Sequence, residues 1–320
     1  MCLFSADEPA SFAEAEKDKE WCAAMMEEMA STETNKTWRL TQLPPGHRAI
    51  GLKWFFKLKR DANSEVIKRK ARLVAKGYVQ RQGVDYKEVF TTVARMEMVR
   101  VRIALATHHG WLIHHMDVKT AFLNGDLIEE VYVEQPPGFA VDREEHKVLR
   151  LQKAMCGLRQ APRAWNAKLD SSLLALGFEQ SQAEHAVYRR GGGDKLLLVG
   201  VYVDDLIITG SSIEELTRFK LEMTNLFRMS DLGELSFYLV IEVQQQSGLI
   251  TLQQAAYARK LLQKAGMEDC NPCAVPMEAR LKLRKTGGGE PIDATFYCSI
   301  VGSLRYLVHT RPDITYAIGC

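Results

Sequence analysis

The chain of 320 residues is long enough for a substantial core in two packed units, and its 46% apolar and 26% charged residues are typical of a folded globular protein. Its longest apolar run, residues 196–203, is far shorter than the roughly 18 residues that cross a bilayer, which argues against a membrane protein. Seven scattered cysteines give no disulfide framework, and no basic and apolar leader is visible, so we expect a reducing compartment and no secretion.

The net charge of only +2 hides two segments of opposite charge, and the acidic one comes first. Residues 1–35 hold nine acidic residues and two lysines. The spacing of their apolar residues predicts a helix over residues 12–32. Its apolar side is formed by Trp21, Met25, Met26 and Met29.

The basic segment follows at residues 53–81, where ten lysines and arginines stand against Asp61 and Glu65. Alternating apolar residues predict two strands joined by a turn at 61–64, with the basic side chains on one face. Such a face suits a polyanion such as nucleic acid, and a solvated strand pair without a partner is the plainer alternative.

The middle of the chain alternates helices with short apolar strands. Residues 96–109 fit a helix ended by a glycine, and an apolar strand over 111–118 carries Asp117 near its end. Paired prolines stop a short strand within 131–139, and a helix begins at Pro162. The apolar positions of this helix are Trp165, Leu169, Leu173 and Leu176.

Two adjacent acids interrupt an apolar stretch at residues 196–209, where Asp204 and Asp205 join two predicted strands. A carboxylate among apolar neighbours needs a counter-charge, and a divalent cation can supply it. If the strand that ends near Asp117 is their neighbour in one sheet, the carboxylates of Asp117 and Asp204 converge. Two carboxylates and a substrate phosphate suit Mg²⁺, and two such ions can activate a hydroxyl for attack on phosphorus. A solvated turn is the alternative.

The last third of the chain continues the mixture of helices and hairpins. Ser212 and Glu215 form a capping box for a helix. Its apolar positions are Leu216, Phe219, Met223 and Leu226. Residues 235–252 fit a hairpin that turns at 247–248, and residues 277–295 fit a polar, glycine-rich linker. This order of elements predicts an α+β fold.

Other suggestive patterns carry less weight. At most one histidine of each adjacent pair could face a shared ion, and no fitting ligand set accompanies them, which argues against a zinc site. These histidines are His108, His109, His114 and His115. Cys270 and Cys273 have zinc-knuckle spacing but no second pair nearby, and the glycines at 191–193 fit a hairpin tip better than a phosphate loop.

Eight motifs in one order resemble the reverse transcriptase of copia-type LTR retrotransposons, from about Trp38 to the end of the chain. They are KWFFKLKRD (53–61), KARLVAKGYVQRQGVDYKEVF (70–90), HMDVKTAFLNGDL (115–127), CGLRQAPRAW (156–165), YVDD (202–205), DLGELSFYLVIEV (231–243), YARKLLQKAGM (257–267) and IVGSLRYLVHTRPDITYA (300–317). One such motif is weak evidence, whereas this many in one order are specific.

The resemblance implies a catalytic acid set, with Mg²⁺ as the cofactor and Mn²⁺ as the alternative metal. The set consists of Asp117, Asp204 and Asp205. Asp117 and Asp204 are the expected main metal ligands, and Asp205 is expected to tune the charge and support the turn.

The resemblance also implies binding sites for a deoxynucleoside triphosphate and a template-primer. Lys70 and Arg72 match basic residues that clasp the triphosphate, which suits their charge. Phe122 resembles the steric gate that excludes a ribose 2′-hydroxyl. The segment under the nascent base pair holds Gly157, Gln160 and Pro162, where a glycine would let the backbone approach nucleic acid. The residues expected to contact nucleic acid are Lys53, Lys57, Lys59 and Tyr202.

The implied architecture is a right-hand polymerase with fingers, an antiparallel-sheet palm and a thumb. Residues 1–37 form an acidic helical segment in this interpretation, residues 38–278 the polymerase, and residues 279–320 a linker and the start of a truncated connection and ribonuclease H region. The expected partners are an RNA or DNA template-primer and dNTPs, without a membrane, and the oligomeric state is left open. The expected location is the cytoplasm, a virus-like particle within it, or the nucleus.

Three departures from the family pattern leave a second interpretation. Cys156 stands where an aromatic residue is usual, Leu239-Val240 where Leu-Gly is usual, and FTTVAR where a Ser-Pro-Val form is usual. The alternative is therefore a catalytically impaired remnant that only binds nucleic acid. A two-metal phosphohydrolase is a third possibility, but it gives no reason for the basic hairpin or for Phe122.

Overall fold

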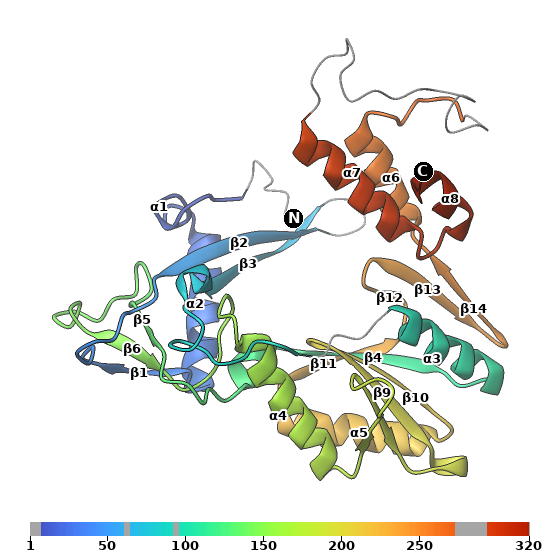
Figure 1. The fold of residues 1–320 in the computed structure, drawn as a ribbon, viewed down its shortest axis with the longest axis horizontal. Helices are drawn as coiled ribbons and strands as arrows, with labels where there is room; N and C mark the ends of the chain where they lie inside the picture. Colours follow the sequence, from blue (N-terminus) through green and yellow to red (C-terminus); the bar gives the residue numbers. More distant parts are fainter. Residues whose placement is uncertain (1–7, 61–64, 92–95, 273–292, 320) are drawn as a thin grey trace. The chain divides into compact units, whose positions relative to one another are not determined.

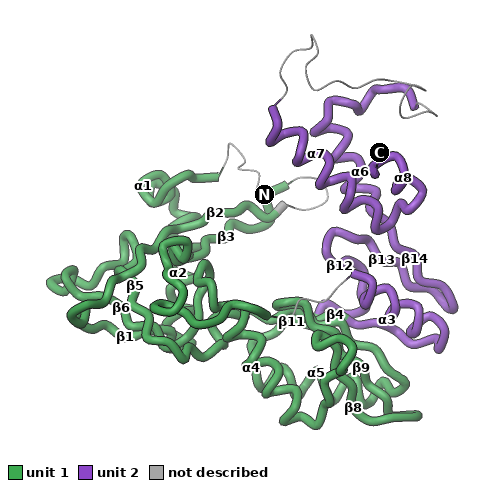
Figure 2. Tube along the Cα trace, in the orientation of Figure 1, with its two compact units in different colours: residues 1–94, 115–231 green, residues 95–114, 232–320 purple. Residues whose placement is uncertain are grey.

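The computed structural model divides the chain into two compact units (Figure 2). The first unit consists of residues 1–94 and 115–231, and the second of residues 95–114 and 232–320. The residues that the structure describes are 8–60, 65–91, 96–272 and 293–319. The turn predicted at 61–64 and most of the linker predicted at 277–295 lie outside them. Among the described helices, none is both long and apolar enough to cross a membrane.

Helices and antiparallel hairpins alternate along the chain (Figure 1), which confirms the α+β class. The α-helices are α1 (Phe12–Ala15), α2 (Lys19–Thr34), α3 (Met96–His109), α4 (Ala161–Ala175), α5 (Ile213–Leu226), α6 (Ala255–Ala265), α7 (Ala294–Leu307) and α8 (Thr315–Gly319). Short 3-10 helices are η1 (Gly77–Val79), η2 (Ala121–Asn124), η3 (Gly193–Lys195) and η4 (Pro312–Ile314). The strands are β1 (Trp38–Thr41), β2 (Leu52–Arg60), β3 (Val66–Ala75), β4 (Ile113–Val118), β5 (Tyr132–Val133), β6 (Val148–Leu151), β7 (Glu179–Gln180), β8 (Val187–Arg190), β9 (Leu197–Tyr202), β10 (Asp205–Gly210), β11 (Met229–Glu234), β12 (Phe237–Tyr238), β13 (Ile241–Gln246) and β14 (Leu249–Gln253).

A six-stranded sheet in the order β11-β4-β10-β9-β8-β7 organises the first unit. The pairs β7–β8, β8–β9 and β9–β10 are antiparallel. Alternation along β10 turns Leu206 and Ile208 into the core under α4 and α5, and Met116 of β4 joins them there. Side chains one position away in sequence therefore lie on the opposite face. That opposite face carries Asp205, His115 and Asp117.

The helices that cover this sheet follow the predicted patterns with one exception. Trp165, Leu169 and Leu173 of α4 are buried, and Gly177 follows the helix with a φ of +81°. In α5 the hydroxyl of Ser212 accepts a hydrogen bond from the main-chain N–H of Glu215, as the capping box predicts. The buried apolar positions of α5 are Leu216, Phe219 and Met223. The prediction for Leu226 was wrong, because this last residue of the helix is 50% exposed.

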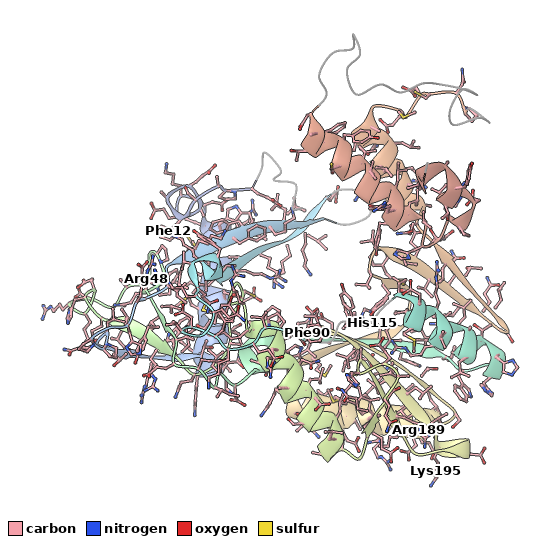
Figure 3. All side chains as sticks on the ribbon, viewed as in Figure 1. Phe12, Arg48, Phe90, His115, Arg189 and Lys195 are labelled. Carbon is pink, nitrogen blue, oxygen red and sulfur yellow. The ribbon has the colours of Figure 1, made fainter. Side chains whose placement is uncertain are left out.

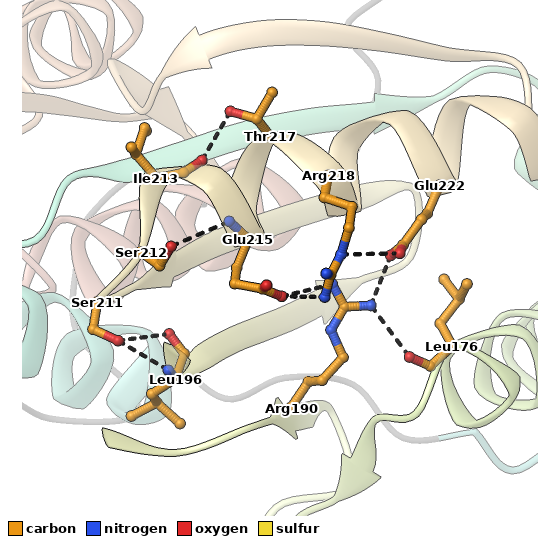
Figure 4. Close-up of polar contacts among 10 residues, drawn as sticks. All are labelled: Leu176, Arg190, Leu196, Ser211, Ser212, Ile213, Glu215, Thr217, Arg218 and Glu222. Atoms are coloured by element: carbon orange, nitrogen blue, oxygen red, sulfur yellow. Dashed lines mark hydrogen bonds and ion pairs between the residues drawn. The ribbon is translucent and has the colours of Figure 1, made fainter. Parts of the chain in front are cut away.

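Arg190 ties β8 to α5 through a network of charges (Figure 4). Its guanidinium lies 2.7 Å from a carboxylate oxygen of Glu222 and 3.7 Å from one of Glu215, and it donates to the carbonyl of Leu176 at 3.2 Å. The same guanidinium lies 4.7 Å from the ring centroid of Phe178. A charge this shielded is tolerated because two carboxylates and an aromatic face surround it.

The basic hairpin β2–β3 packs its apolar face on α2. Trp54 and Phe56 are buried, and the ring of Trp21 from α2 meets Phe56 edge-to-face at 5.2 Å. The single helix predicted over 12–32 was wrong in two details. The chain forms α1 and α2 separately, since the Asp18 side chain accepts from the Glu20 N–H and begins a new helix, and Met26 is 66% exposed.

The second unit contains α3, the sheet β12-β13-β14 and the helices α6 to α8. The hairpin β13–β14 turns at Ser247 and Gly248 as predicted. Tyr257 of α6 and Tyr306 of α7 meet edge-to-face at 5.5 Å, and the phenol of Tyr306 donates to the carbonyl of Leu239. Contacts between segments far apart in the sequence therefore hold this unit together, and the side chain of Arg100 in α3 likewise donates to the carbonyl of His309.

Candidate active site

The strands that carry the predicted acids are neighbours in the sheet. β4 lies beside β10, and the Val118 N–H donates to the main-chain carbonyl of Asp204 at 2.8 Å. Asp117 and Asp204 line one cavity of about 340 Å³. The structure thus brings together the two carboxylates that the sequence analysis paired.

The turn between β9 and β10 is held in an unusual backbone conformation. Val203 has a φ of +55°, which is rare for a β-branched residue. The indole N–H of Trp165 donates to the carbonyl of Val203 at 2.6 Å. Because α4 anchors the turn in this way, the cost of the strained residue is offset by a buried hydrogen bond.

Asp204 is electrostatically disfavoured in its ionised form. Burial raises the pKa of its carboxyl above the ordinary value, and the neighbouring carboxylates of Asp205 and Asp117 raise it further. Arg72 acts in the opposite direction, but more weakly. Excess negative charge at this point favours a cation between the carboxylates.

Asp205 is held away from the cavity by a histidine. Its Oδ1 lies 2.7 Å from Nε2 of His115, a side chain in β4 that is only 8% exposed (Figure 3). Asp205 is not among the cavity-lining residues, whereas Lys119 forms an ion pair with Asp117 there. The pairing of His115 with Asp205 was not predicted from the sequence, although the spacing of two residues between His115 and Asp117 on one strand places both on one face.

The basic hairpin supplies the cationic wall of the cavity through Lys59, Lys70 and Arg72. Burial lowers the pKa of the Lys70 ammonium, and the positive charges of Arg72 and Lys59 lower it further. Lys53 is exposed and does not line the cavity, and Lys57 is engaged in an ion pair of 3.0 Å with Glu8.

Phe122 lies on the same cavity, in η2 directly after β4. Its ring is half-buried and packs against both apolar clusters of the first unit. Thr120 precedes the turn with a φ of +51°, which redirects the chain after Lys119. The aromatic residue is therefore fixed beside the acids by packing on two sides.

Gly157 and Gln160 have structural neighbours and do not line the cavity. A Cβ at Gly157 would lie 2.1 Å from the carbonyl oxygen of Ala75, and its φ is +92°. Gly157 thus lies against the chain's own β3, and its approach to nucleic acid stays a prediction. Gln160 is 2% exposed, donating to the Asp85 carbonyl and accepting from Gln80, each at 3.0 Å. Tyr202 pairs with Asp205 across the hairpin and is also outside the lining.

The cavity also contains residues that the sequence did not suggest. Glu28 and Thr32 of α2 form part of its wall, together with Met155 and Cys156. Burial raises the pKa of the Cys156 thiol, so this cysteine is not an activated nucleophile. Cys156 begins the motif CGLRQAPRAW, but no motif identified Glu28 or Thr32, because α2 reaches the cavity only through tertiary packing.

The donor set fits a hard divalent cation. Asp117 and Asp204 offer carboxylate oxygens, and a bound metal would offset the burial and the neighbouring negative charges that raise the pKa of Asp204. Within the described ranges, no group of three or more His, Cys, Asp or Glu residues is arranged to hold a metal by itself. Magnesium suits such a site, because it commonly takes its remaining ligands from water and substrate phosphate.

The family model described as "Reverse transcriptase (RNA-dependent DNA polymerase)" matches residues 35–279. The chain is 38% identical to the retrovirus-related Pol polyprotein from transposon RE1 of Arabidopsis thaliana, over 99% of this chain and 22% of that protein. It is 37% identical to the Pol polyprotein from transposon TNT 1-94 of Nicotiana tabacum, over 92% of this chain and 23% of that one. The chain thus spans under a quarter of these relatives.

Among solved structures, the foamy viral protease-reverse transcriptase in complex with double-stranded DNA aligns with 90% of this chain and 40% of that one, at a TM-score of 0.42 and 11% identity. The family match covers more than half of the chain, and the copia-type resemblance of its motifs is confirmed by the transposon relatives. The chain therefore belongs to the reverse transcriptase (RNA-dependent DNA polymerase) family.

Proposed function

We propose that this chain catalyses DNA synthesis on an RNA or DNA template, with the primer 3′-hydroxyl attacking the α-phosphate of a dNTP and releasing pyrophosphate. One observation carries the proposal. The carboxylates of Asp117 and Asp204 share a single cavity of about 340 Å³ with a cationic wall and with Phe122. Acids for metal binding, cations for the triphosphate and an aromatic ring beside the sugar are the parts that nucleotidyl transfer needs.

Each part has a role in the proposal. Asp117 and Asp204 would hold Mg²⁺, or alternatively Mn²⁺, which when bound lowers the pKa of the attacking hydroxyl and neutralises the leaving pyrophosphate. Lys70 and Arg72 take up the negative charge of the triphosphate, and the Phe122 ring occupies the space that a ribose 2′-hydroxyl would need.

Asp205 acts indirectly in this proposal. Its carboxylate is committed to His115 at 2.7 Å, so it supports the turn and adds negative charge near Asp204. Lys53 and Lys59 of the hairpin would contact the template-primer backbone, and Lys57 would join them only in exchange for its bond to Glu8. The scattered cysteines fit an intracellular site of action, in the cytoplasm, a virus-like particle or the nucleus.

Primer extension on poly(rA)·oligo(dT) with Mg²⁺ and dTTP tests the proposal. Asp204→Asn should abolish extension while the variant remains folded and still unfolds in a cooperative thermal transition. Asp194→Asn, which removes an exposed acid in η3 that does not line the cavity, should extend as the wild type does. Absence of extension by the wild type, with retained and salt-dependent binding of template-primer, would identify the chain as a nucleic-acid-binding remnant.

A further inference from the structure

Glu28 is the acidic residue of the described part of the N-terminal segment that lines the cavity. It lies on α2, is half-buried, and lines the cavity with Lys70, Arg72 and the two aspartates. Its Oε1 accepts a hydrogen bond from the main-chain N–H of Leu73 in β3, at 3.2 Å. That bond fixes the carboxylate on the strand beside the two cations, because Leu73 directly follows Arg72.

Other acids of this segment are already paired with the hairpin. Lys68 forms an ion pair of 2.8 Å with Glu27, and Arg69 contacts both Asp18 and Glu20. Within the part of the chain that the structure describes, Glu28 forms no ion pair of this kind. The negative charge of Glu28 therefore acts on the charged groups that line the cavity and is not neutralised by a single ion-pair partner among the described residues.

The electrostatics of Glu28 and the cations are coupled. Burial raises the pKa of Glu28, and Lys70 and Arg72 counteract that rise. Burial lowers the pKa of Lys70. The negative charge of Glu28 counteracts this lowering more strongly than the charge of Asp117 does. Each charge thus makes the other less costly when the cavity holds no anion.

We propose that Glu28 sets the affinity of the cavity for polyphosphate. In the empty cavity Glu28 is the counter-charge of Lys70 and Arg72, and a bound triphosphate takes over that role. This rests on the proposed function, in which the cavity binds a dNTP. A bound triphosphate gains the two cations but also experiences the negative charge of Glu28. Substrate and the leaving pyrophosphate are both bound less tightly as a result, which favours release of pyrophosphate after each addition.

Glu28→Gln is a clean test, because the amide oxygen can still accept from the Leu73 N–H while the charge is removed. Calorimetric titration with inorganic tripolyphosphate should show tighter binding, on the order of fivefold, since one opposing charge is gone at short range in a half-buried site. The KM for dTTP in primer extension should fall by a similar factor.

Glu27→Gln is the matched control, because Glu27 is the preceding residue on the same helix, pairs with Lys68 and does not line the cavity. It should leave tripolyphosphate affinity within about twofold of the wild type, as expected for an exposed pair. Glu28→Ala provides a second neutral variant if the glutamine variant unfolds, and it should also bind tripolyphosphate more tightly. Unchanged or weaker binding by the neutral Glu28 variants would overturn the proposal and leave Glu28 as a support for β3.

The two proposals fail in different ways. If no primer extension occurs but Glu28→Gln still tightens tripolyphosphate binding, the polymerase proposal fails and the polyphosphate site remains. If extension depends on Asp204 but Glu28→Gln binds tripolyphosphate as the wild type does, only the inference about Glu28 fails.

Discussion

The indole N–H of Trp165 donates a hydrogen bond of 2.6 Å to the main-chain carbonyl of Val203, the residue directly before Asp204. Trp165 is 1% exposed and sits in the core between α4 and the sheet. Val203 is held at a φ of +55°. The position of the acidic turn therefore depends on the packing of a helix that carries none of the proposed catalytic groups.

Trp165→Phe tests this dependence. The smaller ring retains apolar contacts but loses the donor, so we expect a loss of about 1–3 kcal/mol in unfolding free energy. Misplacement of Asp204 should lower kcat by about tenfold to a hundredfold with little change in KM for dTTP. Steady-state primer extension and thermal unfolding measure the two effects. An unchanged kcat in a folded variant would show that the turn keeps its geometry without the bond.

Asp204→Asn should make the metal-free protein more stable at neutral pH. Because burial and two neighbouring carboxylates raise the pKa of Asp204, its ionised form costs stability above the folded-state pKa. We expect a gain of about 0.5–2 kcal/mol for the variant at pH 7, and the gain should vanish as the pH falls through that pKa and the wild type takes up a proton.

Unfolding followed across this pH range, with and without millimolar Mg²⁺, measures the difference. Added Mg²⁺ should stabilise the wild type and not the variant, since binding to the folded state alone raises stability. A variant less stable than the wild type at every pH would contradict the electrostatic argument.

Lys70→Arg should move the alkaline limit of triphosphate binding. Burial, together with Arg72 and Lys59, lowers the pKa of Lys70, so the wild type loses this charge at a lower pH than an ordinary lysine. Above that pKa, kcat/KM for dTTP should fall about tenfold per pH unit. Arginine stays protonated, so the variant should keep its kcat/KM to higher pH. Lys68→Arg is the control on the same strand; equal alkaline limits in all three proteins would exclude Lys70 as the titrating group.

Phe122→Ala should relax the choice between deoxyribonucleotides and ribonucleotides. Removing the ring opens space on the cavity beside Asp117, and the ratio of kcat/KM for dTTP over UTP should fall by on the order of tenfold or more. Phe90→Ala removes an aromatic side chain that is 77% exposed and outside the cavity lining, and it should leave the ratio unchanged. An equal ratio in wild type and Phe122→Ala would place the sugar elsewhere.

Gly157→Ala should lower the unfolding free energy of the first unit by more than the positive φ of Gly157 alone would cause. An alanine Cβ would lie 2.1 Å from the Ala75 carbonyl oxygen, so β3 must move. Gly110 has a φ of +69° but open space within 4 Å of where an alanine methyl would lie, and Gly110→Ala measures the angle alone, at about 1 kcal/mol. We expect Gly157→Ala to cost about 3 kcal/mol or more in thermal or urea unfolding. Equal losses would show that β3 yields easily.

Patterns that depend on neighbours along the chain were predicted well from sequence. The hairpin at Asp204, the capping box at Ser212 and the helix begun near Pro162 each rest on local turn, cap or periodicity rules, and the structure contains all three. Contacts between distant segments were not predictable. The pairing of His115 with Asp205 and the reach of Glu28 into the cavity require knowing which strand lies beside which.

The packing of α2 determines where a recombinant fragment of this chain should begin. The family match begins at residue 35, one residue after α2 ends, yet Trp21 and Met25 are part of the same core as β2 and β3. A protein expressed from residue 35 onward would lack Trp21, which packs against the ring of Phe56, and Asp18, which pairs with the guanidinium of Arg69. The family model begins at residue 35, but the folding unit starts earlier, and we expect a stably folded recombinant protein to need α2.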